Sequence, residues 1–212
     1  MDLFSVTVGR LQENCYFLID DQQQALIFDP GDEAEELLKV IEEEHINPVA
    51  ILLTHAHSDH IGAIDAIREK YDIPVYVNEI EKDFLTNPEL NLSARSGELV
   101  VQQPATHYYP DEMGEFQVGS FRMKLAHIPG HSPGSTVFVF EEHGFIIGGD
   151  VLFNGSVGRS DLLGGSHELL MQGIREKLLV YPATMVVLPG HGEPTTLQQE
   201  IDTNPFLNGA TR

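Results

Sequence analysis

Three histidines and an aspartate lie within six consecutive residues, a density that suggests a metal site. They are His55, His57, Asp59 and His60, in the segment THAHSDHIG directly after the apolar run 49–53. Imidazole nitrogens and carboxylate oxygens are the ligands that zinc and similar divalent ions accept. The alternative is a solvated loop that happens to be rich in histidine, but this order of residue types seldom arises by chance. We therefore interpret the segment as metal-binding.

Three more apolar runs are followed by side chains of the same kind. His131 follows the run 121–128, Asp150 follows 145–149, and His191 follows 185–188. In layered α/β structures, sites are built at the carboxyl edge of the sheet, where a rigid scaffold holds short loops. We therefore expect these three side chains and the histidine-rich segment to meet at such an edge, although they are far apart in the sequence.

The elements that must position these residues alternate between strand and helix. Strand character occurs in nine apolar runs, at 4–8, 15–19, 25–28, 49–53, 74–77, 121–128, 135–140, 145–149 and 185–188. Helical spacing occurs at 32–44, 61–71 and 169–179. Asp32 and Glu35 resemble a capping box at the start of the first helix. No low-complexity linker marks a boundary, so we expect a single domain over residues 1–212.

Composition restricts the partners and the compartment. The chain has 12 basic and 33 acidic residues and a formal net charge of −21. Such a surface repels nucleic-acid phosphates and anionic lipid, so we expect neither nucleic-acid nor membrane binding. We find no signal-peptide pattern and no run near the roughly 20 apolar residues that span a bilayer, which predicts a cytoplasmic protein. The lone Cys15 excludes an internal disulfide, and its apolar setting favours buried packing over a nucleophilic role.

The motifs THAHSDHIG, PGHSPGS, GGDVLF and PGHGEPT, in that order, resemble those of the metallo-β-lactamase superfamily. The resemblance extends from Asp29 to Leu207. It implies an α/β fold, the αββα four-layer sandwich with two mixed sheets flanked by helices, and two divalent metal ions at one edge. Zinc is the first expectation, with iron and manganese as alternatives. By position, the resemblance implies one ion at His55, His57 and His131, a second at Asp59, His60 and His191, and Asp150 as the bridge.

Two longer segments, 148–165 and 189–207, are most similar to the glyoxalase II branch, the hydroxyacylglutathione hydrolases, in a short bacterial form. Longer members carry a C-terminal helical domain that contacts glutathione, and we expect that domain to be absent here. Secreted antibiotic-hydrolysing members with a cysteine ligand need Cys at the position of Asp150, which disfavours an antibiotic-resistance role. The acidic surface likewise disfavours the nuclease branch.

The resemblance and the charges imply hydrolysis of a thioester such as S-lactoylglutathione. A hydroxide bridging the ions would attack the carbonyl, with Asp59 and Asp150 as the catalytic carboxylates. A thiolate leaves without a strong general acid because the pKa of its parent thiol is about 8.5. The expected partner is a small thioester; glutathione, bacillithiol and coenzyme A all stay open as the carrier, as does the oligomeric state. The alternative is a persulfide dioxygenase with one iron held by His55, His131 and Asp150.

Two residues outside the ligand set have two interpretations each. Arg159 lies where longer members have a substrate-binding lysine, and Asp161 replaces a tyrosine there. Arg159 could therefore bind a substrate carboxylate, or it could form a salt bridge with Asp161. Asp29 could accept a hydrogen bond that fixes a ligand histidine, or it could be a turn residue before the first helix. We retain Arg159 as a predicted substrate contact and Asp29 as a predicted support for a ligand.

Overall fold

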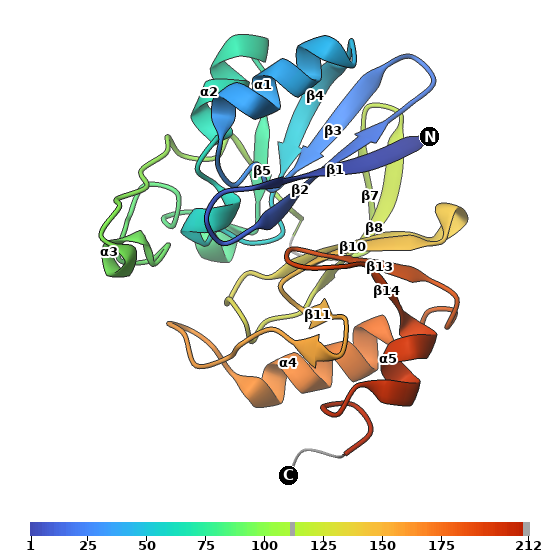
Figure 1. Cartoon of the computed structure of the whole chain (residues 1–212). Helices are drawn as coiled ribbons and strands as arrows, with labels where there is room; N and C mark the ends of the chain where they lie inside the picture. Colours follow the sequence, from blue (N-terminus) through green and yellow to red (C-terminus); the bar gives the residue numbers. More distant parts are fainter. Residues whose placement is uncertain (111–112, 210–212) are drawn as a thin grey trace. The chain divides into compact units, whose positions relative to one another are not determined.

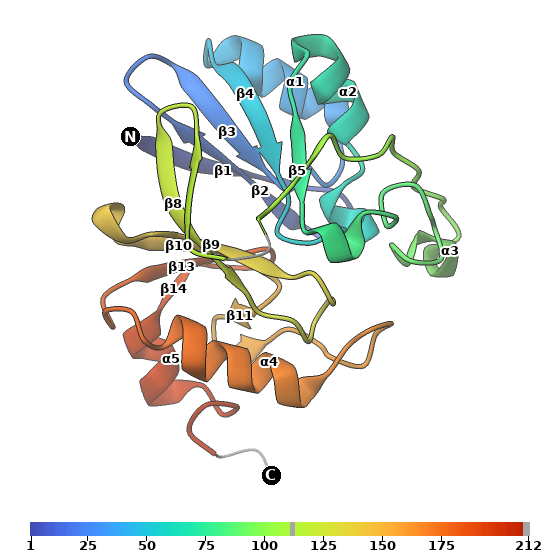
Figure 2. The same ribbon diagram turned by 180° about the vertical axis from the view of Figure 1, so that it is seen from behind.

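All nine predicted runs are strands in the computed structural model, which describes residues 1–110 and 113–209. The chain divides into two compact units (Figures 1 and 2). Unit 1 is Met1–Pro110 with Val118–Phe121, and unit 2 is Asp111–Gln117 with Arg122–Arg212.

Unit 1 is built on a mixed six-stranded sheet in the order β1-β2-β3-β4-β5-β6. The first three strands pair antiparallel and the last four pair parallel. Its strands are β1 (Asp2–Val8), β2 (Glu13–Ile19), β3 (Gln24–Phe28), β4 (Asn47–Leu52), β5 (Val75–Val77) and β6 (His107–Tyr108). Helices α1 (Ala34–Glu43) and α2 (Ile64–Tyr71) cover one face of this sheet (Figure 1), and α3 (Ser93–Ser96) lies in the following loop region.

The core of unit 1 explains why these runs become strands. Every residue of β2 is buried, and Phe17 and Ile27 are fully enclosed beside Leu37 and Ile41 of α1. Burial of a large apolar side chain contributes about 1.5–3 kcal/mol. The apolar stripe of the first predicted helix is therefore the face that packs on the sheet.

Unit 2 contains a second mixed six-stranded sheet, in the order β14-β13-β10-β9-β8-β7. Strands β10 and β13 are parallel neighbours, so their carboxyl ends lie at the same edge. The strands are β7 (Glu115–Val118), β8 (Phe121–His127), β9 (Thr136–Phe140), β10 (Phe145–Gly149), β13 (Val186–Pro189) and β14 (Thr195–Thr196), with a small hairpin of β11 (Leu152–Phe153) and β12 (Ser156–Val157). Helix α4 (His167–Gly173), continued by a π-helical turn at Ile174–Leu178, and α5 (Leu197–Thr203) flank this sheet (Figure 2).

The predicted capping box at the first helix is wrong. Helix α1 begins after Glu33, whose backbone is left-handed at φ 49°, and no side chain caps the helix there. The Asp32 carboxylate instead accepts a hydrogen bond from the Glu33 backbone N–H at 2.7 Å. A left-handed residue at the cap turns the chain away from the geometry in which the two side chains of a capping box reach back to the backbone.

No helix within the described residues is long and apolar enough to cross a membrane.

Candidate metal centre

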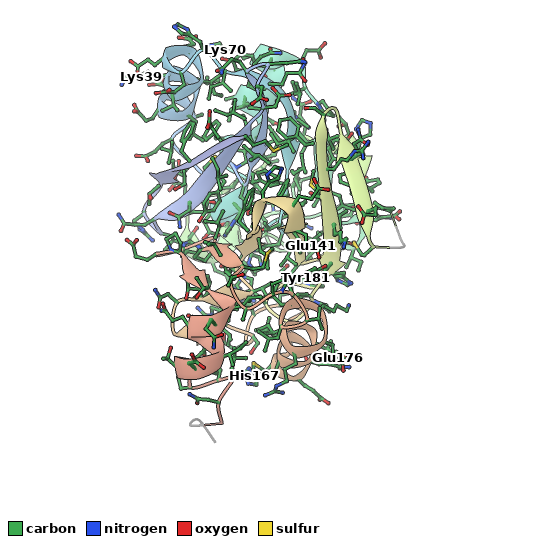
Figure 3. The ribbon with its side chains drawn as sticks, turned by 90° about the vertical axis from the view of Figure 1, so that its right-hand side faces the viewer. Lys39, Lys70, Glu141, His167, Glu176 and Tyr181 are labelled. Atoms are coloured by element: carbon green, nitrogen blue, oxygen red, sulfur yellow. The ribbon has the colours of Figure 1, made fainter. Side chains whose placement is uncertain are left out.

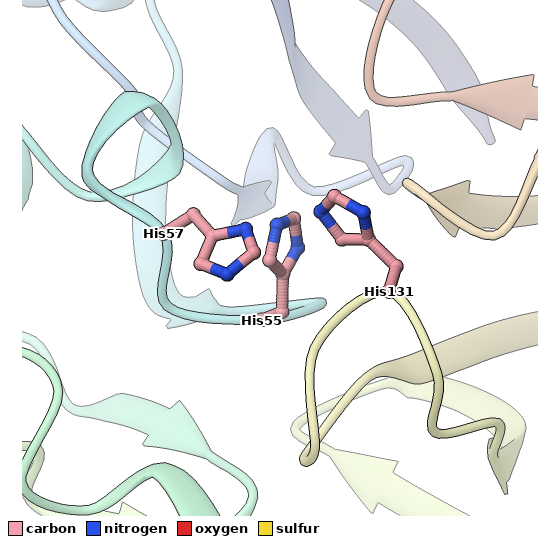
Figure 4. A group of neighbouring side chains, drawn as sticks. All are labelled: His55, His57 and His131. Carbon is pink, nitrogen blue, oxygen red and sulfur yellow. The ribbon is translucent and has the colours of Figure 1, made fainter. Parts of the chain in front are cut away.

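The histidine-rich segment of unit 1 packs three imidazole rings together at the end of β4. His55 and His60 are 1% and 0% exposed, and their ring centroids lie 4.1 Å apart. His57 lies edge-on to His55 at 4.6 Å between centroids (Figure 4). A short 3-10 turn at Ser58–His60 follows and carries Asp59 and His60. Buried imidazoles at this spacing are suited to metal coordination.

Asp29 and Thr54 fix the orientation of two of these rings. The Asp29 carboxylate accepts hydrogen bonds from the Thr54 backbone N–H at 2.7 Å, from Thr54 Oγ1 at 2.5 Å and from His60 Nδ1 at 3.1 Å. Because the Thr54 hydroxyl proton is given to Asp29, its oxygen accepts from His55 Nδ1 at 3.0 Å. Both rings therefore carry their proton on Nδ1 and present Nε2 as the nitrogen that can bind a metal ion. Asp29 therefore accepts a hydrogen bond that fixes a predicted ligand histidine, which was the first of its two interpretations. Its backbone also has the left-handed conformation of a turn residue, at φ 48°.

Three supporting residues of unit 1 were not found by sequence reasoning. Glu13 is 1% exposed and lies 3.8 Å from His60 Nδ1. Glu81, fully buried, accepts a hydrogen bond from the Ala56 backbone N–H at 2.6 Å and so holds the loop between His55 and His57. At Gly31, a Cβ would lie 1.8 Å from the backbone oxygen of Asp59, so only glycine permits this close approach.

In unit 2, two of the predicted histidine ligands lie close to the carboxylate of the third predicted ligand, Asp150. Asp150 follows β10, and Oδ2 of its carboxylate lies 3.4 Å from His131 Nε2 and 3.6 Å from His191 Nε2. Asp150 and His191 come together because they follow parallel neighbouring strands, whose ends are joined by the Gly190 N–H donating to the Gly149 oxygen at 2.9 Å. The structure thus brings these three residues together as the sheet-edge argument expects.

The loop at 158–159 fixes the ring of His131. His131 Nδ1 donates to the backbone oxygen of Arg159 at 2.8 Å, which leaves Nε2 as the metal-binding nitrogen. His131 itself is carried on a separate loop after β8 (Figure 4). At Gly158 a Cβ would lie 1.9 Å from the Asp150 backbone oxygen, so glycine is required for this loop to reach the ligands. The glycine was visible in the sequence, but its contact partner was not.

The donor set fits divalent metal ions. Ligand atoms at about 2.0–2.2 Å from a tetrahedral ion lie about 3.3–3.6 Å from one another. The distances around Asp150 Oδ2 match that spacing, and Asp59 Oδ2 lies slightly farther, at 3.9 Å, from His60 Nε2. One carboxylate oxygen of Asp150 therefore lies at ligand spacing from both His131 and His191, and its role as the bridge between two ions stays a prediction.

The remaining predicted residues lie as follows. The Arg159 side chain forms two hydrogen bonds with the Asp161 carboxylate, at 2.8 and 2.9 Å, while both side chains stay well exposed. The pair raises the pKa of Arg159 and lowers the pKa of Asp161. In this structure Arg159 thus forms the salt bridge with Asp161 that was its second interpretation. A contact between Arg159 and the substrate stays a prediction. Cys15 is fully buried, as predicted.

The sequence and the fold both match known proteins. A sequence profile described as the metallo-beta-lactamase superfamily matches residues 8–191. The chain belongs to this superfamily. Among curated relatives, "Probable metallo-hydrolase YqgX" of Bacillus subtilis is 49% identical over 203 residues, which is 95% of each chain. "Hydroxyacylglutathione hydrolase GloC" of Haemophilus influenzae is 35% identical over 209 residues, 98% of this chain and 99% of the relative.

Two solved structures are similar to this chain over nearly its whole length. "BLEG-1 B3 metallo-beta-lactamase" shares 44% identity at a TM-score of 0.95, covering 98% of this chain and 100% of that chain. The protein TTHA1623, solved in a di-iron-bound form, shares 41% identity at a TM-score of 0.85, covering 96% of this chain and 100% of that chain. The predicted fold class, with two mixed six-stranded sheets and flanking helices, is confirmed. The comparisons and the donor groups support a metal-dependent hydrolase with the His/Asp two-metal site of this superfamily.

Proposed function

We propose that the chain is a thioesterase that hydrolyses the S-acyl derivative of a small thiol, such as S-lactoylglutathione. The observation that carries this proposal is the 35% identity to a hydroxyacylglutathione hydrolase over nearly the full length of both chains. The all-histidine-and-aspartate donor set supports it. We further propose that His55, His57, Asp59, His60, His131, Asp150 and His191 hold two divalent ions, with zinc, iron and manganese as the candidates.

The residues of the chain prepare the donor atoms before any substrate arrives. Asp29 and Thr54 hold the protons of His60 and His55 on Nδ1, and the Arg159 backbone oxygen does the same for His131. When bound, the two divalent ions supply an activated water and polarise the substrate carbonyl. Because hydrogen bonds fix the orientation of three rings, little reorganisation is needed when charge develops on the carbonyl oxygen.

β-Lactam hydrolysis is the second candidate, because a structure called a B3 metallo-beta-lactamase is 44% identical to this chain. The absence of a cysteine at position 150 disfavours only the members with a cysteine ligand. A carbonyl carbon is attacked in both reactions, so the donor set alone does not separate them.

A substrate panel tests the proposal. The purified protein, loaded separately with zinc, iron and manganese, would be assayed with S-lactoylglutathione, with a chromogenic cephalosporin, and with glutathione persulfide under oxygen measurement. We expect thioester hydrolysis to have the highest kcat/KM, and Asp150→Ala to abolish it, which excludes a contaminating enzyme. Cephalosporin hydrolysis or oxygen consumption without thioester turnover would contradict the proposal.

A further inference from the structure

A cavity of about 330 Å³ opens in unit 1 beside Asp59. Its walls are the β1–β2 turn, with Arg10 and Leu11, and the segment 96–102, with Leu99. Leu11 and Leu99 are exposed by 62% and 67%. The volume is within the range of about 300–1,000 Å³ that is usual for ligand pockets and is larger than a short acyl group needs. The cavity therefore has room for a larger part of a substrate than the acyl group.

Arg10 is the one cation among the residues that line the cavity, and its side chain makes no ion pair in the described part of the chain. Three other cations of unit 1, Lys39, Arg68 and Lys70, have acidic partners, whereas Lys82 and Arg95, which do not line the cavity, form no ion pair among the described residues. Lys39 lies 3.6 Å from Glu36, and Lys70 contacts Glu42 (both lysines are labelled in Figure 3). In a chain with 33 acidic residues, an arginine at a cavity wall that engages none of them is available to a carboxylate from outside.

The cavity also contains acidic groups. Asp32 and Glu98 line it in addition to Asp59. Two acids beyond the predicted ligand would repel a carrier that bears several phosphates, whereas they would attract an ammonium group. A ligand with a carboxylate and an ammonium group matches this distribution of charge.

We propose that Arg10, on the β1–β2 turn, binds the carboxylate of the substrate's thiol carrier in this cavity. Glu98 then faces the ammonium group of the same carrier. The inference rests on the proposed thioester hydrolysis, because Asp59 then places the scissile bond at the end of the cavity. It assigns recognition of the carrier to Arg10, on the β1–β2 turn, in place of Arg159.

Binding of S-hexylglutathione tests this assignment, since a thioether has no carbonyl to hydrolyse. Isothermal titration would compare it with its dimethyl ester and with its N-acetyl form. We expect Arg10→Gln to weaken binding of the parent thioether about five- to ten-fold and to change binding of the dimethyl ester by less than about two-fold. We expect Glu98→Gln to weaken the parent thioether and to leave the N-acetyl form unchanged.

Turnover gives a second readout. With S-lactoylglutathione, Arg10→Gln should raise KM by a similar factor and leave kcat unchanged, because the contact is the same in the ground state and the transition state. Arg10→Lys should raise KM less than Arg10→Gln does, since lysine keeps the positive charge but lacks the planar guanidinium that makes two hydrogen bonds to a carboxylate. Arg175→Gln, an exposed arginine that does not line the cavity, is the matched control.

Equal losses for the parent thioether and its dimethyl ester in Arg10→Gln would overturn the inference. It would also be overturned if Arg159→Gln, and not Arg10→Gln, raised the KM. Failure of the proposed function is a different result: the wild-type protein would hydrolyse no thioester, whatever the thioether titration shows.

Discussion

At the residue scale, the ligand histidines depend on buried partners that set their tautomers. Asp29 is 3% exposed and accepts three hydrogen bonds, two from Thr54 and one from His60. A carboxylate behind a ligand imidazole fixes the ring and makes its other nitrogen a better donor. Removing that charge should therefore weaken metal binding without touching a ligand.

We expect Asp29→Asn to lower metal affinity about 10- to 100-fold, because the amide keeps the size but loses the charge and one acceptor oxygen. Competition with a chelator of known affinity measures the change, and circular dichroism checks the fold. Asp21→Asn, the same substitution at an exposed aspartate, is the control and should bind metal as the wild type does. Unchanged affinity in Asp29→Asn would show that this hydrogen bond does not support the ligand.

Cys15 offers a second test at this scale. Burial, followed by the nearby Glu13 and Asp29 carboxylates, raises the pKa of the Cys15 thiol well above its ordinary value. The thiolate is therefore disfavoured in the folded protein, and folding stability should fall as the pH rises through the ordinary thiol pKa of about 8.5. At pH 8, mass spectrometry should find no alkylation by iodoacetamide in the native protein and complete alkylation in urea. Rapid alkylation of the native protein would contradict the burial.

The types of residue in the sequence were enough to identify the predicted metal ligands, but not all of the residues that hold those ligands in place. Three histidines in six residues stand out in any sequence, whereas Glu13 and Glu81 are single acids in a chain that has 33. The sequence gives one weak indication for Glu13, because this acidic residue begins a strand that is otherwise apolar except for Asn14. The partners of such a residue depend on which strands are neighbours, and this information is not local in sequence.

At the element scale, long apolar runs were predictable and short elements were not. The nine predicted strands have alternating or continuous apolar residues, which periodicity detects. Strands β6, β11, β12 and β14 have two residues each, too few for any period to show. Strand β7 and helices α3 and α5 were also missed; each is short, with no more than seven residues, and α3 and α5 are largely polar.

The loop after β12 gives a prediction at this scale. Gly158→Ala would place a Cβ against the Asp150 backbone oxygen, so the loop must shift and the hydrogen bond from His131 to the Arg159 oxygen should be lost. We expect a loss of about 1–3 kcal/mol in unfolding free energy and weaker metal binding, measured by urea denaturation and chelator competition. The control is Gly148→Ala, where the nearest atom lies at 3.4 Å. If both variants behaved alike, the close approach at Gly158 would have no functional consequence.

At the scale of the whole molecule, charge and metal binding are coupled. The net charge of −21 is reduced by each bound divalent ion, so metal binding relieves repulsion among the carboxylates. Each unit contributes part of the predicted donor set, four side chains from unit 1 and three from unit 2. The predictions of a small-molecule thioester as partner and of a single domain remain predictions.

Acid should release the metal. Histidine ligands coordinate only when neutral, so metal affinity and activity should both fall below roughly pH 6. Equilibrium dialysis at pH 5 and pH 7.5, with the rate measured in parallel, tests this. Activity that stays constant to pH 5 while the metal remains bound would contradict histidine coordination.

The most direct measurement of the central claim is the metal content of the purified protein beside that of Asp150→Ala. Elemental analysis should find about two divalent ions per wild-type chain and at most about one in the variant, with kcat/KM for the thioester reduced more than about 100-fold and circular dichroism unchanged. An Asp150→Ala protein that keeps two ions and hydrolyses the thioester at the wild-type rate would contradict the account.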